Sequence, residues 1–264
     1  MHELCLNCFQ YSPYVGSGAP IEALIAAAAD AGFAHIGLDV YALDASGHAP
    51  GDTRGLLERH GVSCFEMLGL DVGVDDDAAV AMAQTAARWV GETGAAWVLT
   101  IVSSAPNAEV VDRFGRCADI IRVEGGRLAL EFLPFLPVDT IASARSVCES
   151  VGAERAKVLI DSWHVGRGSD TPETVAACDA EWIAYVQFDD ALPAIGPLTD
   201  EVTTRRTWPG EGELELDEFA AAVRASGYTG PVSIELLNRE WRTRGMAPEE
   251  FAQRAMITSA PYWW

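Results

Sequence analysis

Four acidic or amide side chains lie near the C-terminal ends of four successive strand-like segments. The segments are RLALEFL with Glu131, KVLIDSWH with Asp161, IAYVQFDD with Gln187 and PVSIELLN with Glu235. A polar group buried without a partner costs roughly 2–7 kcal/mol, and an unpaired charge costs more. Three carboxylates and an amide oxygen suit a divalent cation such as Mg²⁺, Mn²⁺ or Co²⁺. We therefore predict one shared metal site. The alternative is a buried carboxylate network paired with Arg and Lys.

Strand-like and helix-like runs alternate along the whole chain and would position these four residues. The strand-like runs are short and apolar without clean alternation, which is typical of parallel strands covered on both faces. Ala-rich helical runs separate them, and several end in Gly, which favours the left-handed conformation that caps a helix. We expect strands near residues 4–9, 35–40, 62–68, 97–103, 127–133, 157–163, 183–189 and 231–237.

Eight strands alternating with eight helices predict one closed (β/α)₈ TIM-barrel domain over residues 1–264, since such barrels usually have about 250 residues. An open doubly wound sheet is the competing fold. It would carry a GxGxxG loop after its first strand, and the nearest segment, GSGAP at 16–20, lacks the third glycine. Neighbouring barrel strands lie about 4.8 Å apart, so four consecutive strand ends can converge on one cation. The long segment 191–215 after the seventh strand is expected to be functional.

Composition argues against several classes of protein. The net charge of −21 and the pI near 4.4 would repel phosphate backbones, so no nucleic-acid partner is expected. The chain has no long apolar run, and its first residues lack a basic flank and an apolar signal core. We therefore expect no membrane partner and predict a cytoplasmic location. The six cysteines are interpreted as reduced, mostly buried thiols, because no second CxxC or Cys/His cluster completes a zinc site.

Five short motifs carry a family resemblance. They are LALEF, the D-x-x-H of DSWH, VQFDDA, R-x-x-PGEGEL at 206–214, and GYTGPVSIE. On these residues the chain resembles the xylose-isomerase-like TIM barrels, a group of sugar-phosphate isomerases, ketose epimerases and dehydroshikimate dehydratases. The likeness covers nearly the whole chain and is strongest from residue 127 to the end. It implies that Glu131, Asp161, Gln187 and Glu235 are the ligands of one divalent metal ion.

The chain departs from the resembled family on the seventh strand, where many relatives have His and this chain has Gln187. An amide at this place is familiar from dehydroshikimate dehydratases. Because an amide binds metals through oxygen, the departure favours Mn²⁺, with Mg²⁺ or Co²⁺ as alternatives, over zinc. It also argues against the DNA-repair endonucleases of the same superfamily. Those enzymes need several histidines and a basic groove, whereas this chain has five histidines and a net charge of −21.

The resemblance also implies roles for individual residues around the metal. Glu131 and Glu235 would form an acid–base pair on opposite sides of the substrate. His164, three residues after Asp161, would contact substrate or help to move a proton, with a surface loop position as the alternative. Arg206 would hold a hydroxyl, carboxylate or phosphate of the substrate, with pairing to nearby acids as the alternative.

Four further side chains are expected near the site. Trp163 would form part of its wall. Glu211 would order the long loop or enter the site, and Glu66 would bind substrate hydroxyls or pair with a core Arg. Asp189 shares a strand face with Gln187 and is expected to support the ligands.

These features predict a metal-dependent enzyme that abstracts a proton α to a carbonyl of a small polyhydroxylated substrate through a metal-stabilised enediolate. A sugar isomerase or epimerase is the first hypothesis. A dehydroshikimate- or inosose-dehydratase-like lyase is the alternative, favoured by Gln187 but opposed by FEMLGLD in the third strand, which lacks the stretch expected in that group. A non-catalytic sugar- or metal-binding subunit is a second alternative. The aromatic tail 262–264 would cover an apolar surface or a subunit contact, so a homo-oligomer stays open.

Overall fold

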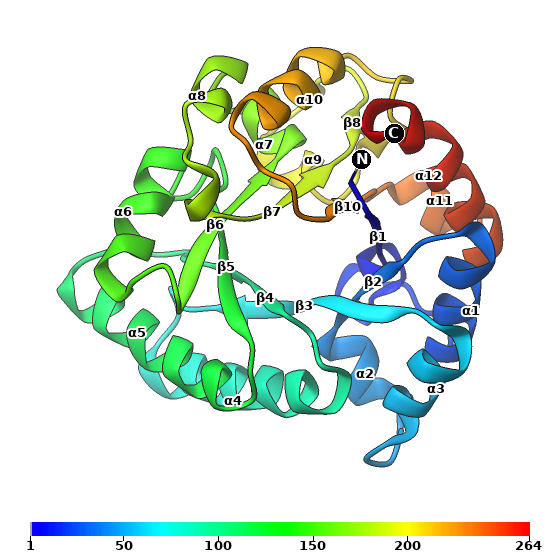
Figure 1. Cartoon of the computed structure of the whole chain (residues 1–264), viewed down its shortest axis with the longest axis horizontal. Coiled ribbons are helices and arrows are strands. Elements are labelled where there is room, and N and C mark those ends of the chain that lie inside the picture. The colour runs from blue at the N-terminus through cyan, green and yellow to red at the C-terminus, as the bar shows by residue number, and fades with distance from the viewer. Residues whose placement is uncertain (1) are drawn as a thin grey trace.

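The chain folds into a closed barrel of eight parallel strands ringed by helices (Figure 1). The computed structural model describes residues 2–264. Strands that follow one another in sequence are neighbours, and β1 closes the barrel between β2 and β10. The predicted (β/α)₈ fold is confirmed. The barrel strands are β1 (Leu4–Asn7), β2 (His35–Asp39), β3 (Ser63–Asp71), β4 (Trp97–Ile101), β5 (Arg127–Glu131), β6 (Ala156–Asp161), β7 (Ile183–Phe188) and β10 (Val232–Ile234).

All eight barrel strands begin within one residue of their predicted positions, whereas several of their ends differ by two or three residues. The apolar pattern predicts where a strand runs, but side-chain caps decide where it stops. β6, for example, ends at Asp161 because the carboxylate of Asp161 caps the helix that follows.

Helices alternate with the strands on the outside of the barrel (Figure 1). They are α1 (Ile21–Ala31), α2 (Val40–Ser46), α3 (Asp52–His60), α4 (Asp76–Thr93), α5 (Ala108–Val123), α6 (Ile141–Val151), α7 (Ser162–Arg167), α8 (Pro172–Ala176), α9 (Leu198–Glu201), α10 (Leu216–Ala225), α11 (Arg239–Thr243) and α12 (Pro248–Trp263). The sequence pattern does not predict the short helices α2, α7, α9 and α11. One or two turns are too short to show a helical period, and three of these helices instead begin at an Asp or Asn cap.

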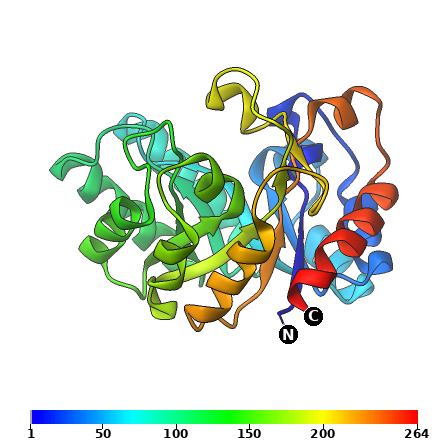
Figure 2. The same ribbon diagram turned by 90° about the horizontal axis from the view of Figure 1, so that it is seen from above.

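The long segment 191–215 is folded and anchored rather than loose. It projects from the end of the barrel opposite to the chain termini (Figure 2). The short strands β8 (Asp190–Ala191) and β9 (Arg206–Thr207) pair antiparallel, and this hairpin brings Arg206 back beside the end of β7. The buried carboxylate of Asp190 accepts hydrogen bonds from the backbone N–H groups of Gly210, Gly212 and Leu214. A Cβ on Gly212 would lie 2.2 Å from Asp190, so this close approach requires glycine.

The aromatic tail forms the end of α12 and covers apolar surface near the N-terminus. Trp263 is buried, and its ring packs edge-on against Phe188 with 5.0 Å between centroids. The indole N–H of Trp264 donates to the carbonyl of His2 at 3.1 Å. The covering role that the sequence predicted is present in this chain, and a homo-oligomer stays a prediction.

The helices and the cysteines of the described residues can be compared with the expectations from composition. Between residues 2 and 264, no helix has both the length and the apolar character needed to cross a bilayer. All six cysteines are buried and free of disulfides, as predicted.

Asp190→Ala is expected to lower the free energy of unfolding by about 3 kcal/mol, because three backbone N–H groups lose a buried carboxylate acceptor. Chemical denaturation would measure the loss, and limited proteolysis would locate it in the segment 208–214. Asp30→Ala, an exposed position on α1, is the control. Equal stability of the two variants would contradict the anchoring role of Asp190.

Candidate functional site

The four predicted ligands lie at or near the carboxyl ends of four neighbouring barrel strands. Glu131 and Asp161 are the last residues of β5 and β6, and Glu235 directly follows β10. Gln187 lies in β7 and pairs in register with Asp161. All four side chains are buried. Strand order and register thus place the four residues on neighbouring strands at one end of the barrel.

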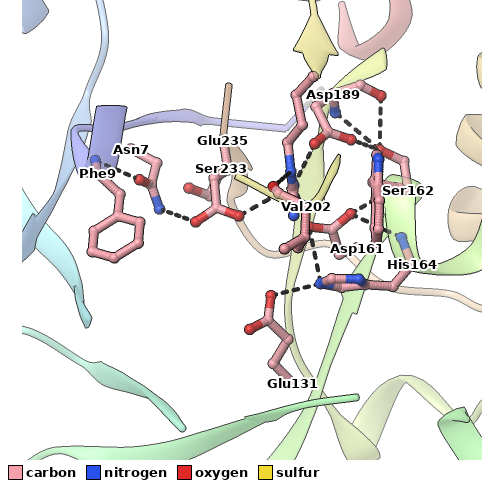
Figure 3. A network of polar contacts seen from close by, with 12 residues as sticks. Asn7, Phe9, Glu131, Asp161, Ser162, His164, Asp189, Val202, Ser233 and Glu235 are labelled. Atoms are coloured by element: carbon pink, nitrogen blue, oxygen red, sulfur yellow. Dashed lines mark hydrogen bonds and ion pairs between the residues drawn. The ribbon is translucent and has the colours of Figure 1, made fainter. Parts of the chain in front are cut away.

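A helix cap gives the Asp161-x-x-His164 motif its geometry. Oδ1 of Asp161 accepts hydrogen bonds from the backbone N–H groups of Trp163 at 2.6 Å and His164 at 3.3 Å, so α7 begins directly after the strand. The turn carries His164 back over the strand end, where its Nε2 lies 2.8 Å from Oε1 of Glu131 (Figure 3). Glu131, Asp161 and His164 each offer one ligand atom, and these atoms lie within 4.8 Å of one another. His164 therefore belongs to the site and not to a surface loop.

Arg206 places its guanidinium among the carboxylates. Nη1 donates to Oδ2 of Asp161 at 2.7 Å and to Oδ2 of Asp189, and it lies 3.2 Å from Oε2 of Glu235. Nε donates to the carbonyl of Val202 at 3.1 Å. The residue is 1% exposed, so one nitrogen faces three acids inside the protein. The sequence also allowed a network of buried carboxylates paired with Arg and Lys, and the pairing of three carboxylates with Arg206 matches part of that alternative.

Burial and the single guanidinium give these carboxyl groups different pKa values. Burial raises the pKa of Glu235 well above its ordinary value; Arg206 opposes this shift, and Glu131 and Asp161 add to it. Burial also raises the pKa of Asp189, again against the effect of Arg206. Burial also tends to raise the pKa of Asp161. The positive charges of Arg206 and the His164 imidazole outweigh this effect, and they hold the pKa of Asp161 below its ordinary value. The guanidinium therefore favours the ionised form of Asp161 most strongly.

The side chain of Gln187 indicates that this cluster of buried polar groups can bind a ligand. Both polar atoms of its amide are buried, and neither has a hydrogen-bond partner among residues 2–264. Four carboxyl groups, those of Glu131, Asp161, Asp189 and Glu235, face one guanidinium and one imidazole, so they outnumber the cationic groups. A divalent cation held by Glu131, Asp161, Gln187 and Glu235 would balance the charge and give the amide oxygen a partner. The residues present therefore fit such an ion.

Asn7 is a site residue that the sequence analysis missed. It is the last residue of β1, and its amide nitrogen donates to Oε1 of Glu235 at 3.1 Å and to Oε1 of Glu66 at 3.0 Å. Glu66 is fully buried inside the barrel, where the hydroxyl of Ser233 also donates to it. A Cβ on Gly37 would lie 2.4 Å from this carboxylate, so glycine makes room for it. Asn7 thus orients Glu235, and its place at a strand end is the signal that would have revealed it.

A cavity of about 440 Å³ opens beside these side chains. Glu131, Arg206 and Glu235 line it, so two of the four predicted ligands face the cavity directly. The segment 191–215 also contributes to the wall, through Thr199 and Val202.

Three residues that were expected to contact substrate lie elsewhere, and none of them lines the cavity within the described chain. Trp163 is fully buried beneath Arg206, with 5.6 Å between Cζ and the ring centroid. Glu66 is enclosed inside the barrel. Glu211 is exposed and pairs with Arg254 of α12 at 2.6 Å, so an ion pair holds it on the surface. For Glu211 the geometry agrees with the alternative role of ordering the loop.

Comparison with known proteins gives the family. Residues 25–257 match the model of the Xylose isomerase-like TIM barrel family. The chain belongs to this family. Inosose isomerase of Bacillus subtilis (strain 168) is 31% identical over 152 residues, which are 56% of this chain and 53% of that enzyme. 3-Dehydroshikimate dehydratase of Pseudomonas aeruginosa is 29% identical over 136 residues, 51% of this chain and 22% of that enzyme.

A crystal structure of the IolI protein with a bound zinc atom shares the fold. It superposes with a TM-score of 0.85 at 20% identity, over 98% of this chain and 97% of that one. The chain spans about half the length of the inosose isomerases that it matches. The family resemblance predicted from the motifs is confirmed, and the relatives named above are enzymes.

Arg206→Gln is expected to tighten Mn²⁺ binding by about tenfold or more, because it removes a competing positive charge from Asp161 and Glu235. Calorimetric titration of protein stripped with a chelator would measure the affinity. Arg205→Gln is the matched control, since the Arg205 guanidinium donates to the carbonyl of Pro193. Unchanged or weaker binding in Arg206→Gln would show that the guanidinium does not compete with the ion.

Proposed function

We propose that this chain is a divalent-metal-dependent enzyme of the isomerase or epimerase type, which removes a proton α to a carbonyl of a small polyhydroxylated substrate. One observation carries the proposal: Glu131 and Glu235 line the same cavity from strands that are separated by β6 and β7. Two carboxylates that face one cavity can take a proton from a substrate on one side and return it on the other. The likeness to inosose isomerase supports this class of reaction.

Glu235 is one member of the acid–base pair in this proposal. Asn7 holds its Oε1 at 3.1 Å, and Nη1 of Arg206 lies 3.2 Å from its Oε2. The contact with Asn7 would keep the carboxylate at the edge of the cavity when a cation displaces Arg206. A base held in this way needs no rearrangement before it meets a substrate C–H group.

Glu131 is the other member of the pair. Nε2 of His164 lies 2.8 Å from its Oε1, and both side chains are buried. His164 can therefore orient Glu131 and exchange a proton with it. In this proposal His164 acts through Glu131 and not by direct contact with substrate, which differs from the expectation drawn from the resemblance.

Glu131, Asp161, Gln187 and Glu235 would hold the cation. When bound there, it would polarise the substrate carbonyl and offset the negative charge that develops as the proton leaves. The oxygen-donor set favours Mn²⁺, with Mg²⁺ or Co²⁺ as alternatives. The zinc atom of the IolI structure adds zinc to the ions that a titration must include.

A dehydratase is the second candidate function. The amide of Gln187 favours it, and a 3-dehydroshikimate dehydratase is among the relatives. The third-strand segment FEMLGLD weighs against it, because it lacks the stretch expected in that group. An isomerase or epimerase exchanges a substrate C–H with solvent deuterium, whereas a dehydratase forms a conjugated product that absorbs in the ultraviolet. Binding without turnover in the presence of Mn²⁺ would instead indicate a non-catalytic subunit.

Glu235→Gln is expected to lower turnover by about 100-fold to 10,000-fold while leaving the fold intact, because it removes one member of the acid–base pair. Turnover would be measured on ketoses, inososes and dehydroshikimate with Mn²⁺ present, and circular dichroism would check the fold. Glu218→Gln, at an exposed position of α10, is the control. Activity of Glu235→Gln close to that of the control would remove Glu235 from the acid–base pair.

Gln187→Ala is expected to weaken Mn²⁺ binding by about 10-fold to 100-fold, because the ion loses one oxygen donor. Calorimetric titration would measure this change. Gln84→Ala, at an exposed position of α4, is the control. An unchanged titration would show that Gln187 does not bind the metal.

A further inference from the structure

We infer that the substrate of the proposed reaction is an uncharged hydroxy ketone that carries an apolar or aromatic substituent beyond its hydroxylated head. This inference rests on the proposed function and adds the class of substrate to it. It is drawn from the walls of the 440 Å³ cavity, in which Glu131, Arg206 and Glu235 form the polar end.

Apolar side chains form most of the remaining wall. Ten of the twenty residues that line the cavity are Leu, Ile, Val or Phe, and two more are Tyr. They include neighbouring pairs on β3 and β4 and after β5: Leu68 and Leu70, Leu99 and Ile101, and Leu133 and Phe135. A substrate hydroxyl pressed against these side chains would lose its hydration without gaining a partner. An apolar substituent would instead gain from burial against the same surface.

Three aromatic rings stack along one side of the cavity. The centroids of Phe9 and Tyr14 lie 5.6 Å apart, those of Tyr14 and Tyr41 lie 5.0 Å apart, and all three residues line the cavity. Tyr14 is 64% exposed, although Phe9 and Tyr41 both stack on its ring. A flat apolar group packs well against such rings. The stack therefore suits an aromatic substituent better than a chain of hydroxyl groups.

The charges of the cavity disfavour an anionic substrate. Asp71, Glu131 and Glu235 bring negative charge to the wall, and the one cationic side chain among the described lining residues is Arg206. Its Nη1 already faces three carboxylates. A phosphate or carboxylate beyond the hydroxylated head would lie along the apolar wall, where the described lining residues supply no cationic group. The lining residues therefore favour a neutral substrate over a sugar phosphate.

The volume of the cavity agrees with a substituted substrate. A volume of about 440 Å³ falls within the roughly 300–1,000 Å³ of pockets that enclose drug-sized ligands. The polar end can hold the carbonyl and its adjacent hydroxyl, and the apolar wall leaves room for a ring-sized group beyond them.

Three ketoses that differ at one carbon would test the inference on Mn²⁺-loaded protein. They are D-fructose, 6-O-benzyl-D-fructose and D-fructose 6-phosphate, and calorimetry would measure the affinity of each. We expect the benzyl ether to bind about tenfold or more tightly than D-fructose, because its ring is buried against the apolar wall, and the phosphate to bind most weakly. The inference is overturned if D-fructose or its phosphate binds as tightly as the benzyl ether, or if none of the three binds at millimolar concentration.

A variant of a cavity-lining residue distinguishes burial of the benzyl ring in the cavity from non-specific hydrophobic binding. Phe135→Ala, at a half-buried position outside the acid–base and metal residues, is expected to weaken binding of the benzyl ether by about fivefold and to leave D-fructose within about twofold. Ile257→Ala removes an apolar side chain that is 72% exposed on α12 and is the matched control. An equal loss of affinity for the benzyl ether in both variants, or no loss of affinity in either, would overturn the inference.

Solvent-deuterium exchange separates this inference from the proposed function. A benzyl ketose that binds tightly and exchanges no proton would contradict the proposed reaction and leave the substrate class standing. In the opposite case, D-fructose exchanges its proton at least as fast as the benzyl ether and binds equally well. That result would support the proposed reaction and overturn the inferred substrate class.

Discussion

Repulsion among buried carboxylates at the mouth of the barrel is the constraint on which the rest of the site depends. Asp161, Asp189 and Glu235 converge where water cannot screen them, and their charge must be balanced from within the protein or by a bound ion. In the structure Arg206 supplies one positive charge to all three. The amide of Gln187 gains nothing from that arrangement, because it remains unpaired. The guanidinium therefore balances only part of the negative charge and leaves the Gln187 amide without a partner. A divalent cation would balance more of the charge and could also bind the amide oxygen.

Regular elements hold these groups close together. Asp161 is fixed because it ends β6 and caps α7, and the same cap delivers His164 to Glu131. The hairpin of β8 and β9 delivers Arg206, and its loop is tied to the buried carboxylate of Asp190. These supports come from strand ends and caps, which explains how closely spaced acids can be maintained on a rigid scaffold.

The sequence predicts the barrel and the ligand candidates because both depend on local patterns. Apolar runs mark the eight strands, and a polar residue that ends such a run marks the mouth, as for Glu131 and Gln187. The sequence does not predict the partner of each group, because partners come from distant segments. Arg206 reaches Asp161 only through a hairpin of two short strands, and Asn7 reaches Glu235 only because β1 pairs with β10.

Differences between expectation and structure follow the same rule. Glu211 belongs to a motif of the family but is held on the surface by Arg254, a residue that lies more than forty positions away. Trp163 lies two residues after Asp161 in sequence, yet the turn of α7 buries it beneath Arg206 instead of exposing it to substrate. Neighbourhood in sequence indicates that a residue is near the site, whereas the cap and the ion pair decide which way it faces.

The central claim is that Glu131, Asp161, Gln187 and Glu235 bind one divalent cation, with Arg206 displaced from it. Crystals soaked in Mn²⁺ and measured for anomalous scattering test this claim most directly. The account predicts one strong peak within bonding distance of those four side chains and a guanidinium that has withdrawn from Glu235. A map without such a peak, in which Arg206 still bridges Asp161 and Glu235, would contradict it.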